Sequence, residues 1–330
     1  MRRWRIDPQE TGWRDTPEFE AAVADILAGR LVAVPTETVY GLAADATNPL
    51  ACAAIYAAKG RPSFNPLIAH VASTEQAHRH GILDERARRL ADAFWPGPLT
   101  MVVAKRPDSP VCDLATAGLE TIALRVPAAA IMRELSSASG RPIAAPSANR
   151  SGRISGTTAD AVAGDLGEHL ALLIDAGPTP VGVESTIVGL AGERPTLLRP
   201  GGVSRAEIEA ALGEALAAPS LSCETAPEAP GMLTSHYAPR AGMRLNAERV
   251  EPGEALLAFG TPLPPGSEHA AAVVQLSEQA DLRQAAAHLF TAMRRLDASG
   301  AERIAVMPVP ETGLGEAIND RLRRAAAPRD

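Results

Sequence analysis

The sequence predicts an α/β protein, in which helices flank open sheets of strands. Short apolar runs bounded by glycine or proline alternate along the chain with longer runs of helix-forming residues. Polar and charged residues interrupt several apolar runs near their ends, and open α/β folds bind ligands at strand ends. The chain has 330 residues, which is enough for two domains and a sizeable core.

The composition is that of a globular protein. Hydrophobic residues make up 46% of the chain and charged residues 22%. Aromatic residues make up only 3%, so we expect no base-stacking platform for single-stranded nucleic acid. The net charge of −7 argues against a large basic surface for RNA and leaves room only for a local, weak contact.

The sequence also excludes several kinds of localisation and metal site. No run approaches the ~18 apolar residues that a membrane span needs. The basic residues 1–5 lead into Ile-Asp-Pro instead of an apolar signal region, so we expect a cytoplasmic protein with no membrane contact. The cysteines, Cys52, Cys112 and Cys223, are far apart and form no C-x-x-C, so no disulfide framework or zinc site is expected.

The first elements lead to two motifs that carry charge. Apolar spacing predicts a helix at 17–29, and the β-branched run 31–34 predicts a buried strand after it. The chain then places two hydroxyls, a carboxylate and a phenol within residues 36–40. An alanine-rich helix at 51–58 ends at Lys59 and Gly60, and Arg61 follows directly. Two cations at this spacing suit a polyphosphate.

The following elements show the same pattern of strands that end in polar residues. Arg125 lies inside an apolar strand, where a charge must be paired or face a cleft. Ser147 and Asn149 precede a glycine in a loop that can face an anion. Ser204 and Glu207 have the spacing of a capping box. The pattern predicts strands at 67–71, 99–103, 121–127, 172–175, 183–188 and 195–199, and helices at 84–94, 128–137, 157–166 and 204–216.

A change of composition separates the last ninety residues from the rest. Residues 218–241 contain four prolines and no periodicity, which predicts a linker, although it carries His236-Tyr237-Ala238-Pro239. After it, strands and helices alternate again, which indicates a small α/β domain. We therefore predict a catalytic domain at 1–217, the linker at 218–241 and a C-terminal domain at 242–330. Its predicted elements are strands at 255–259, 271–276 and 303–306 and helices at 281–298 and 314–326.

The familiar catalytic motifs are missing from the sequence. There is no Walker A sequence, no G-x-G-x-x-G after a strand, no G-x-S-x-G and no H-E-x-x-H. The separated cations and the hydroxyl and amide residues around them therefore indicate a nucleotide or other phosphate site. Such a site works by electrostatic stabilisation and needs no covalent nucleophile.

Five motifs resemble the YrdC-type domain: PTETVYGL at 35–42, KGRP at 59–62, NPL at 65–67, PSAN at 146–149 and ESTIV at 184–188. With LRPG at 198–201 and HYAP at 236–239, residues 18–240 resemble the two-domain threonylcarbamoyl-AMP synthase family. The resemblance implies a twisted mixed sheet with flanking helices, followed by a smaller Rossmann-like α/β C-terminal domain. It also implies that L-threonine, bicarbonate or CO2, and ATP give threonylcarbamoyl-AMP and pyrophosphate. That product would feed the N6-threonylcarbamoylation of adenosine in tRNA by a downstream transfer machinery.

The resemblance also implies roles for single residues. Lys59 and Arg61 would stabilise the reacting phosphate, and Mg²⁺ would sit on the ATP phosphates with no metal ligand from the protein. Tyr237 would cover the site from the linker and exclude water. The residues implied for ATP are Arg61, Asn65, Thr121, Ser147, Asn149, Ser155, Arg199 and Tyr237. Those implied for threonine are Thr36, His70, Arg125 and Ser185, with Arg125 as a bidentate partner of the carboxylate.

Two other functions remain open from the sequence. An RNA-binding module would use a basic concave face of such a domain, although the acidic charge weighs against tight binding. A carbamoyl-transfer relative would keep the site around Lys59 and Arg61 but use an acceptor other than threonine.

Overall fold

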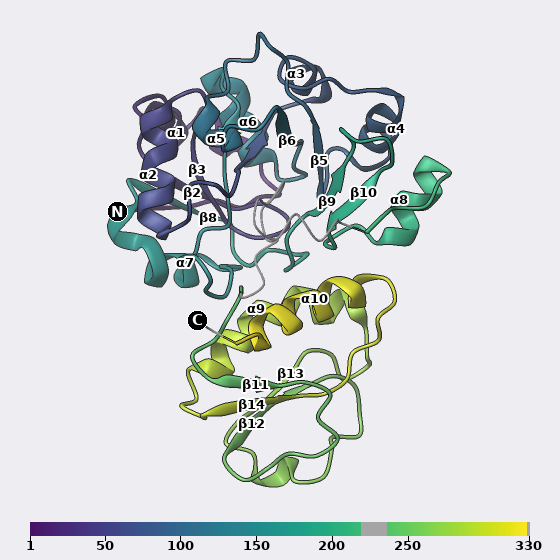
Figure 1. The fold of residues 1–330 in the computed structure, drawn as a ribbon. Coiled ribbons are helices and arrows are strands. Elements are labelled where there is room, and N and C mark those ends of the chain that lie inside the picture. The colour runs from purple at the N-terminus through teal and green to yellow at the C-terminus, as the bar shows by residue number, and fades with distance from the viewer. Residues whose placement is uncertain (219–235, 329–330) are drawn as a thin grey trace.

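The structure is a computed structural model that describes residues 1–218 and 236–328. These residues form two α/β units, one on a ten-stranded sheet and one on a four-stranded sheet (Figure 1). We call them the N-terminal unit (1–218) and the C-terminal unit (236–328). The domain boundaries stay a prediction, because most of the predicted linker falls on 219–235, outside the described residues. No helix of the described residues is long and apolar enough to cross a bilayer.

The ten-stranded sheet mixes parallel and antiparallel neighbours, which confirms the predicted mixed sheet. Its strands are β1 (Arg2–Arg5), β2 (Val32–Val34), β3 (Gly41–Asp45), β4 (Ile68–His70), β5 (Leu99–Ala104), β6 (Thr121–Arg125), β7 (Ile143–Ala144), β8 (Leu172–Asp175), β9 (Thr186–Gly189) and β10 (Thr196–Arg199). Their order is β1-β8-β2-β3-β7-β4-β6-β5-β9-β10. Polar ends of β4, β6 and β10 therefore come from separate parts of the chain.

Helices flank this sheet and are capped as the sequence suggests. Asn48 accepts hydrogen bonds from the first amides of the second helix, and Gly60 ends that helix with φ 59°. The capping box of Ser204 and Glu207 is confirmed. The helices are η1 (Gly12–Asp15), α1 (Pro17–Leu27), α2 (Pro49–Lys59), α3 (Thr74–His78), α4 (Glu85–Phe94), α5 (Asp113–Thr116), α6 (Ala130–Ser139), α7 (Ala159–Leu166), η2 (Gly167–His169) and α8 (Arg205–Leu212).

The C-terminal unit is a small parallel sheet with two long helices. Its elements are β11 (Gly242–Arg244), β12 (Glu254–Ala258), η4 (Ser267–His269), β13 (Val273–Gln275), α9 (Leu282–Asp297), β14 (Arg303–Val306) and α10 (Leu314–Ala326). The strand order is β11-β14-β12-β13, and every pairing is parallel. Figure 1 shows α9 and α10 between this sheet and the N-terminal unit.

The two units share one hydrophobic cluster. Val39, Ile154 and Val183 of the N-terminal unit belong to the same buried cluster as Phe290 and Leu289 of α9. Because burial of apolar surface is the main favourable term in association, this cluster holds α9 and α10 against the loops that carry the polar motifs.

Three sequence-based assignments were wrong in detail. The strand β3 was missed, because its glycine and alanines have weak strand propensity, yet it pairs with β2 from Val32↔Ala43 to Val34↔Gly41. The arginine-rich β1 was also missed, since charged residues on an edge strand show little apolar alternation. The strand predicted at 183–188 begins only at Thr186. The residues before it instead contact the site described next.

Candidate functional site

A cavity of about 40 Å³ lies where the polar ends of β4, β6 and β10 meet the loops. His236 and Tyr237, at the start of the second described range, form part of its wall. Because ligand pockets usually measure roughly 300–1,000 Å³, a cavity of this size leaves no room for a nucleotide in this conformation. The cavity is lined by Thr38, Val39, Arg61, Ile68, His70, Arg125, Ala145, Pro146, Ser147, Glu184, Ser185, Arg199, His236 and Tyr237.

Lys59 and Arg61 form the cationic side of the site. Lys59 ends α2, and its Nζ donates to the carbonyl oxygens of Ser147 at 2.6 Å and Asn149 at 2.5 Å. Arg61 follows the left-handed Gly60, and its Nε donates to the carbonyl oxygen of Asn65 at 3.2 Å. Neither cation has a carboxylate partner among the described residues, although both are more than nine-tenths buried. Their positive charge is therefore oriented by backbone dipoles and left uncompensated.

The pKa values of these two cations reflect the missing counter-charge. Burial lowers the pKa of the Lys59 ammonium well below its usual range, and the neighbouring Arg61 lowers it further. Burial also lowers the pKa of Arg61 to about 10. A bound polyanion would relieve both effects, since a nearby negative charge favours the protonated form.

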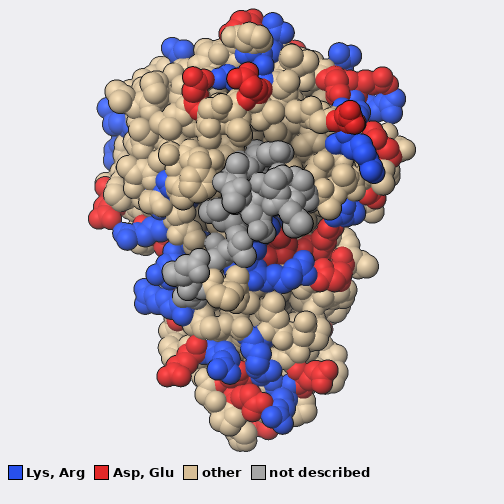
Figure 2. All heavy atoms as spheres, viewed as in Figure 1, with Lys and Arg blue, Asp and Glu red and all other residues tan. Residues whose placement is uncertain are grey.

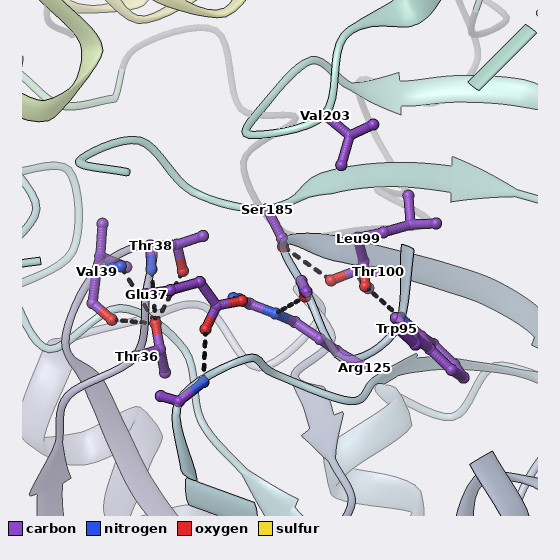
Figure 3. Close-up of polar contacts among 12 residues, drawn as sticks. Thr36, Glu37, Thr38, Val39, Trp95, Leu99, Thr100, Arg125, Ser185 and Val203 are labelled. Atoms are coloured by element: carbon purple, nitrogen blue, oxygen red, sulfur yellow. Dashed lines mark hydrogen bonds and ion pairs between the residues drawn. The ribbon is translucent and has the colours of Figure 1, made fainter. Parts of the chain in front are cut away.

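Arg125 lies at the end of β6 and is held from two sides (Figure 3). Its Nη2 donates to Glu37 Oε1 at 2.6 Å, and its Nε donates to the carbonyl oxygen of Gly97 at 3.2 Å. Glu37 also accepts from the amide of Ala129 at 3.3 Å through its other oxygen. Together these two contacts use two of the five N–H donors of the guanidinium. The bidentate role of Arg125 thus stays a prediction.

Hydroxyl groups line the same part of the site as Arg125 (Figure 3). The Oγ atoms of Ser185 and Thr100 are 2.8 Å apart, so one of them donates to the other. Arg199 Nη2 donates to Ser185 Oγ at 3.1 Å and to its carbonyl oxygen at 2.9 Å. Thr36 closes a hydroxyl turn by donating to the carbonyl oxygen of Val39 at 2.6 Å. The hydroxyls are therefore fixed in place before any ligand binds.

Several buried polar atoms at the site have no hydrogen-bond partner among the described residues. They are Asn65 Oδ1, His70 Nδ1, Asn149 Oδ1 and His236 Nδ1. Burial, together with the charge of Arg125, lowers the pKa of His70 to about 3, so this imidazole is neutral. Unpaired buried polar groups are costly and uncommon in native proteins. Their concentration around one cavity supports a site built for a polar ligand.

Glu184 was not predicted as a site residue, although it opens one of the motifs. Its Oε1 accepts from Ser155 Oγ at 2.6 Å, and its Oε2 accepts from Arg321 Nε at 2.9 Å. Burial would raise the pKa of Glu184, but Arg321 and Arg199 outweigh it and lower the pKa to about 2. Arg321 comes from α10, so the C-terminal unit supplies the counter-charge for a carboxylate at the site.

His236 and Tyr237 join the cavity to the C-terminal unit. Tyr237 is 1% exposed and stacks on Phe290 with ring centroids 5.4 Å apart, and the guanidinium carbon of Arg321 lies 5.2 Å from the centroid of the Tyr237 ring. Tyr237 also has φ 63°, a left-handed conformation that a bulky residue rarely adopts. The fit around the ring therefore compensates for backbone strain.

The structure brings most of the predicted residues together. Seven line the cavity: Arg61, His70, Arg125, Ser147, Ser185, Arg199 and Tyr237. Five others touch a lining residue by a hydrogen bond or belong to one of its loops: Thr36, Lys59, Asn65, Asn149 and Ser155. Thr121 begins β6, about 13 Å along the strand from Arg125, and does not line the cavity.

Sequence reasoning missed four residues of this site. Thr38 and Glu184 stand inside quoted motifs, so their position was a usable signal. His236 stands beside Tyr237 in the linker motif and was quoted without a role. Arg321 had no sequence signal, because it lies 137 residues from Glu184 in an amphipathic helix.

The chain matches two family models. The first is described as telomere recombination and covers residues 24–201, and the second is described as threonylcarbamoyl-AMP synthase, C-terminal domain, and covers residues 203–327.

Relatives and solved structures agree with these matches. The threonylcarbamoyl-AMP synthase of Bacillus subtilis is 40% identical, over 99% of this chain and 98% of the relative. That of Pyrococcus abyssi is 42% identical, over 94% of both chains. A crystal structure of P. abyssi Sua5 complexed with L-threonine superposes with a TM-score of 0.88 at 37% identity, covering 99% of this chain and 98% of the other. The chain therefore belongs to the threonylcarbamoyl-AMP synthase family.

Proposed function

We propose that this protein condenses L-threonine, bicarbonate or CO2, and ATP to threonylcarbamoyl-AMP and pyrophosphate. One observation carries the proposal. Two buried cations, Lys59 and Arg61, are oriented by backbone carbonyls and have no carboxylate partner within residues 1–218 and 236–328, and they lie beside hydroxyl groups and a carboxylate-paired arginine. Such a charge arrangement suits a triphosphate next to a small amino acid. Relatives that are 40% and 42% identical over nearly the whole chain carry the name of this synthase.

The phosphate side of the site would work by neutralising charge. Lys59 and Arg61 would face the phosphates, where negative charge builds up on the leaving pyrophosphate. Their carbonyl contacts hold them in place before the reaction, so little reorganisation is needed. Proposed contacts to ATP come from Arg61, Asn65, Thr121, Ser147, Asn149, Ser155, Arg199 and Tyr237.

The amino-acid side would position threonine. Arg125 would bind the carboxylate and Ser185 the hydroxyl, with Thr36 and His70 completing the pocket. A neutral His70 suits this position, because its unpaired Nδ1 can accept or donate one hydrogen bond without adding charge. A structure of P. abyssi Sua5 was determined with L-threonine, which supports an amino-acid pocket in the family.

The proposed chemistry needs positioning more than a protein nucleophile. The neutral amine of threonine adds to CO2, a carbon–nitrogen bond forms and one proton is lost, which gives a carbamate. A carbamate oxygen then attacks the α-phosphorus, and the bond to the bridging oxygen breaks, so pyrophosphate leaves with the electron pair. Holding the two reactants together supplies much of the rate enhancement.

The described residues hold no group of three His, Cys, Asp or Glu side chains suited to a metal. Mg²⁺ on the phosphates stays a prediction, and no step is derived through it.

The segment with His236 and Tyr237 would open and close the site. In the present conformation both side chains are buried and line a cavity of about 40 Å³, and they would move to admit ATP. After binding they would cover the reactants and exclude water, which would otherwise hydrolyse the mixed anhydride. Removing the residues after Pro230 should then lower activity or the lifetime of the product. Full activity in that truncated chain would refute the covering role.

The product would serve the modification of tRNA by a separate transfer machinery. The present surface gives no reason to expect strong tRNA binding. Figure 2 shows Lys and Arg interspersed with Asp and Glu on one face, in keeping with the net charge of −7. A local tRNA contact stays a prediction.

Pyrophosphate release tests the proposed reaction. We expect release from ATP only when threonine and bicarbonate are both present, with threonylcarbamoyl-AMP identified by mass spectrometry. Release that continues without threonine would contradict the proposal. A screen of the other amino acids separates this synthase from a relative with a different acceptor, since only threonine should support the reaction.

A further inference from the structure

Two cysteines that are 60 residues apart in the sequence lie side by side at α2. Their Sγ atoms are 3.6 Å apart. Cys52 lies within α2 and is fully buried, whereas Cys112 directly precedes α5 and is partly exposed. Cys112 is therefore the residue of the pair that lies nearer the solvent, and Cys52 is the buried one.

The backbone keeps the two cysteines together. The amide of Cys112 donates to the carbonyl oxygen of Ala46 at 3.0 Å, and Cys52 Sγ lies 3.7 Å from the carbonyl oxygen of Asp45. Both are thus anchored to adjacent residues at the end of β3. A disulfide needs a sulfur–sulfur distance of about 2.05 Å, so the sulfurs must approach by about 1.5 Å. Small rotations of two short side chains can supply much of that movement.

The surroundings shift the pKa values of the two thiols in opposite directions. The pKa of Cys112 is lowered mainly by its hydrogen bond with Cys52; burial opposes this shift, and two α5 amides and the charge of Lys105 add smaller contributions that lower it. The pKa of Cys52 is raised by the same contact and by burial. Cys112, the more exposed of the two, is therefore the better placed to react with a solute, and Cys52 lies within reach of its sulfur.

We propose that Cys52 and Cys112 form a dithiol–disulfide pair that is oxidised by hydrogen peroxide. The Cys112 thiolate attacks one peroxide oxygen, the O–O bond breaks, and a sulfenic acid and hydroxide result. The Cys52 sulfur then attacks the Cys112 sulfur, so that the S–S bond forms and the S–O bond breaks. The departing hydroxide takes the Cys52 proton and leaves as water. Two electrons pass from the two sulfurs to the peroxide, and a dithiol reductant reverses the change.

The pair adjoins the contacts that hold Arg61. Tyr56 Oη lies 3.1 Å from the carbonyl oxygen of Leu114 and 3.1 Å from that of Asn65, which also accepts from Arg61. A disulfide at Cys112 would pull on the segment that carries Leu114. This link to turnover rests on the proposed function, and we expect oxidation to lower the rate of pyrophosphate release by about two-fold or more, since small displacements of positioning groups slow catalysis.

A Cys223→Ser background makes the first test unambiguous, because only Cys52 and Cys112 then remain. After treatment of this full-length variant with hydrogen peroxide, we expect intact mass spectrometry to show a loss of about 2 mass units, reversed by dithiothreitol. Peptide mapping should join the two cysteines. A further Cys112→Ser substitution should abolish the loss. Oxidation that only adds oxygen atoms to Cys112, or no oxidation at all, would overturn the proposal.

Turnover of the same variant gives the second test. The fully oxidised chain should release pyrophosphate more slowly than the reduced chain, and dithiothreitol should restore the rate. An unchanged rate in a chain with the disulfide would overturn the link to Arg61. A reduced chain with no threonine-dependent turnover would count against the proposed function, whereas the mass measurement tests the disulfide separately.

Discussion

Two arginines at the site have opposite surroundings. Arg61 contacts only backbone carbonyls and has no carboxylate partner among the described residues. Arg321 is fully buried and pairs with Glu184 at 2.9 Å and with Asp320 at 2.6 Å. The contrast teaches that burial of a cation does not by itself mark a binding residue. The unpaired charge of Arg61 indicates where an anion binds, whereas the paired charge of Arg321 stabilises the fold around that site.

Loss of Arg321 should give the largest effect on stability. In Arg321→Met, Glu184 stays buried without its ion-pair partner, so we expect the free energy of unfolding to fall by about 3–5 kcal/mol. Arg323→Met on the same helix removes an exposed pair with Glu311 and should cost about 0–1 kcal/mol. Denaturant unfolding of both variants measures the difference.

A second substitution separates charge from packing at this pair. Adding Glu184→Gln to Arg321→Met removes the unpaired carboxylate, so much of the lost stability should return. A double variant as unstable as Arg321→Met alone would show that Arg321 acts by packing on Tyr237 and not by neutralising Glu184.

Loss of Arg61 should instead act on catalysis. We expect Arg61→Ala to lower kcat for pyrophosphate release several hundred-fold, because one donor to a developing charge is worth roughly 3–4 kcal/mol. Arg79→Ala, an exposed arginine outside the site, should leave turnover unchanged. Near-normal turnover of Arg61→Ala would remove this residue from the catalytic group.

Low pH should reduce the free energy of unfolding, because His70 is buried in its neutral form. The pKa of His70 is about 3 in the folded chain and 6.5 in the unfolded chain, so the unfolded state binds the proton first as pH falls. The stability contributed by neutral His70 is present above pH 6.5 and is lost progressively between about pH 6.5 and 3, by up to about 1.4 kcal/mol per pH unit. His70→Gln should flatten the dependence of the unfolding free energy on pH in this window. An equal slope in both proteins would contradict the assignment.

Loss of the hydrogen bond between Thr100 and Ser185 should have the smallest effect on stability and turnover. Thr100→Val removes the hydrogen bond to Ser185 but nearly keeps the shape of the side chain. We therefore expect the free energy of unfolding to fall by about 0.5–1.5 kcal/mol. If Ser185 binds threonine, the KM for threonine should rise by a few-fold, while the KM for ATP stays constant. A change in the KM for ATP alone would indicate that Ser185 contacts the nucleotide and not threonine.

Capping residues, glycine stops and polar residues at strand ends are local signals, and they predicted the α/β class and most of the residues that gather around the cavity, whereas the mixed sheet was implied by the family resemblance. Lys59 and Arg61 could be predicted from the end of α2 alone. The strand β3 could not, since its glycine and alanines depend on neighbouring strands for their conformation. The Arg321–Glu184 pair could not either, because it joins two units through tertiary packing that no local pattern records.

A crystal structure with ATP, threonine and bicarbonate tests the central claim most directly. The account predicts phosphate oxygens within hydrogen-bond distance of Lys59 and Arg61, while Arg321 keeps Glu184 as its partner. Phosphates bound by Arg321, with Lys59 and Arg61 still on their backbone carbonyls alone, would contradict it.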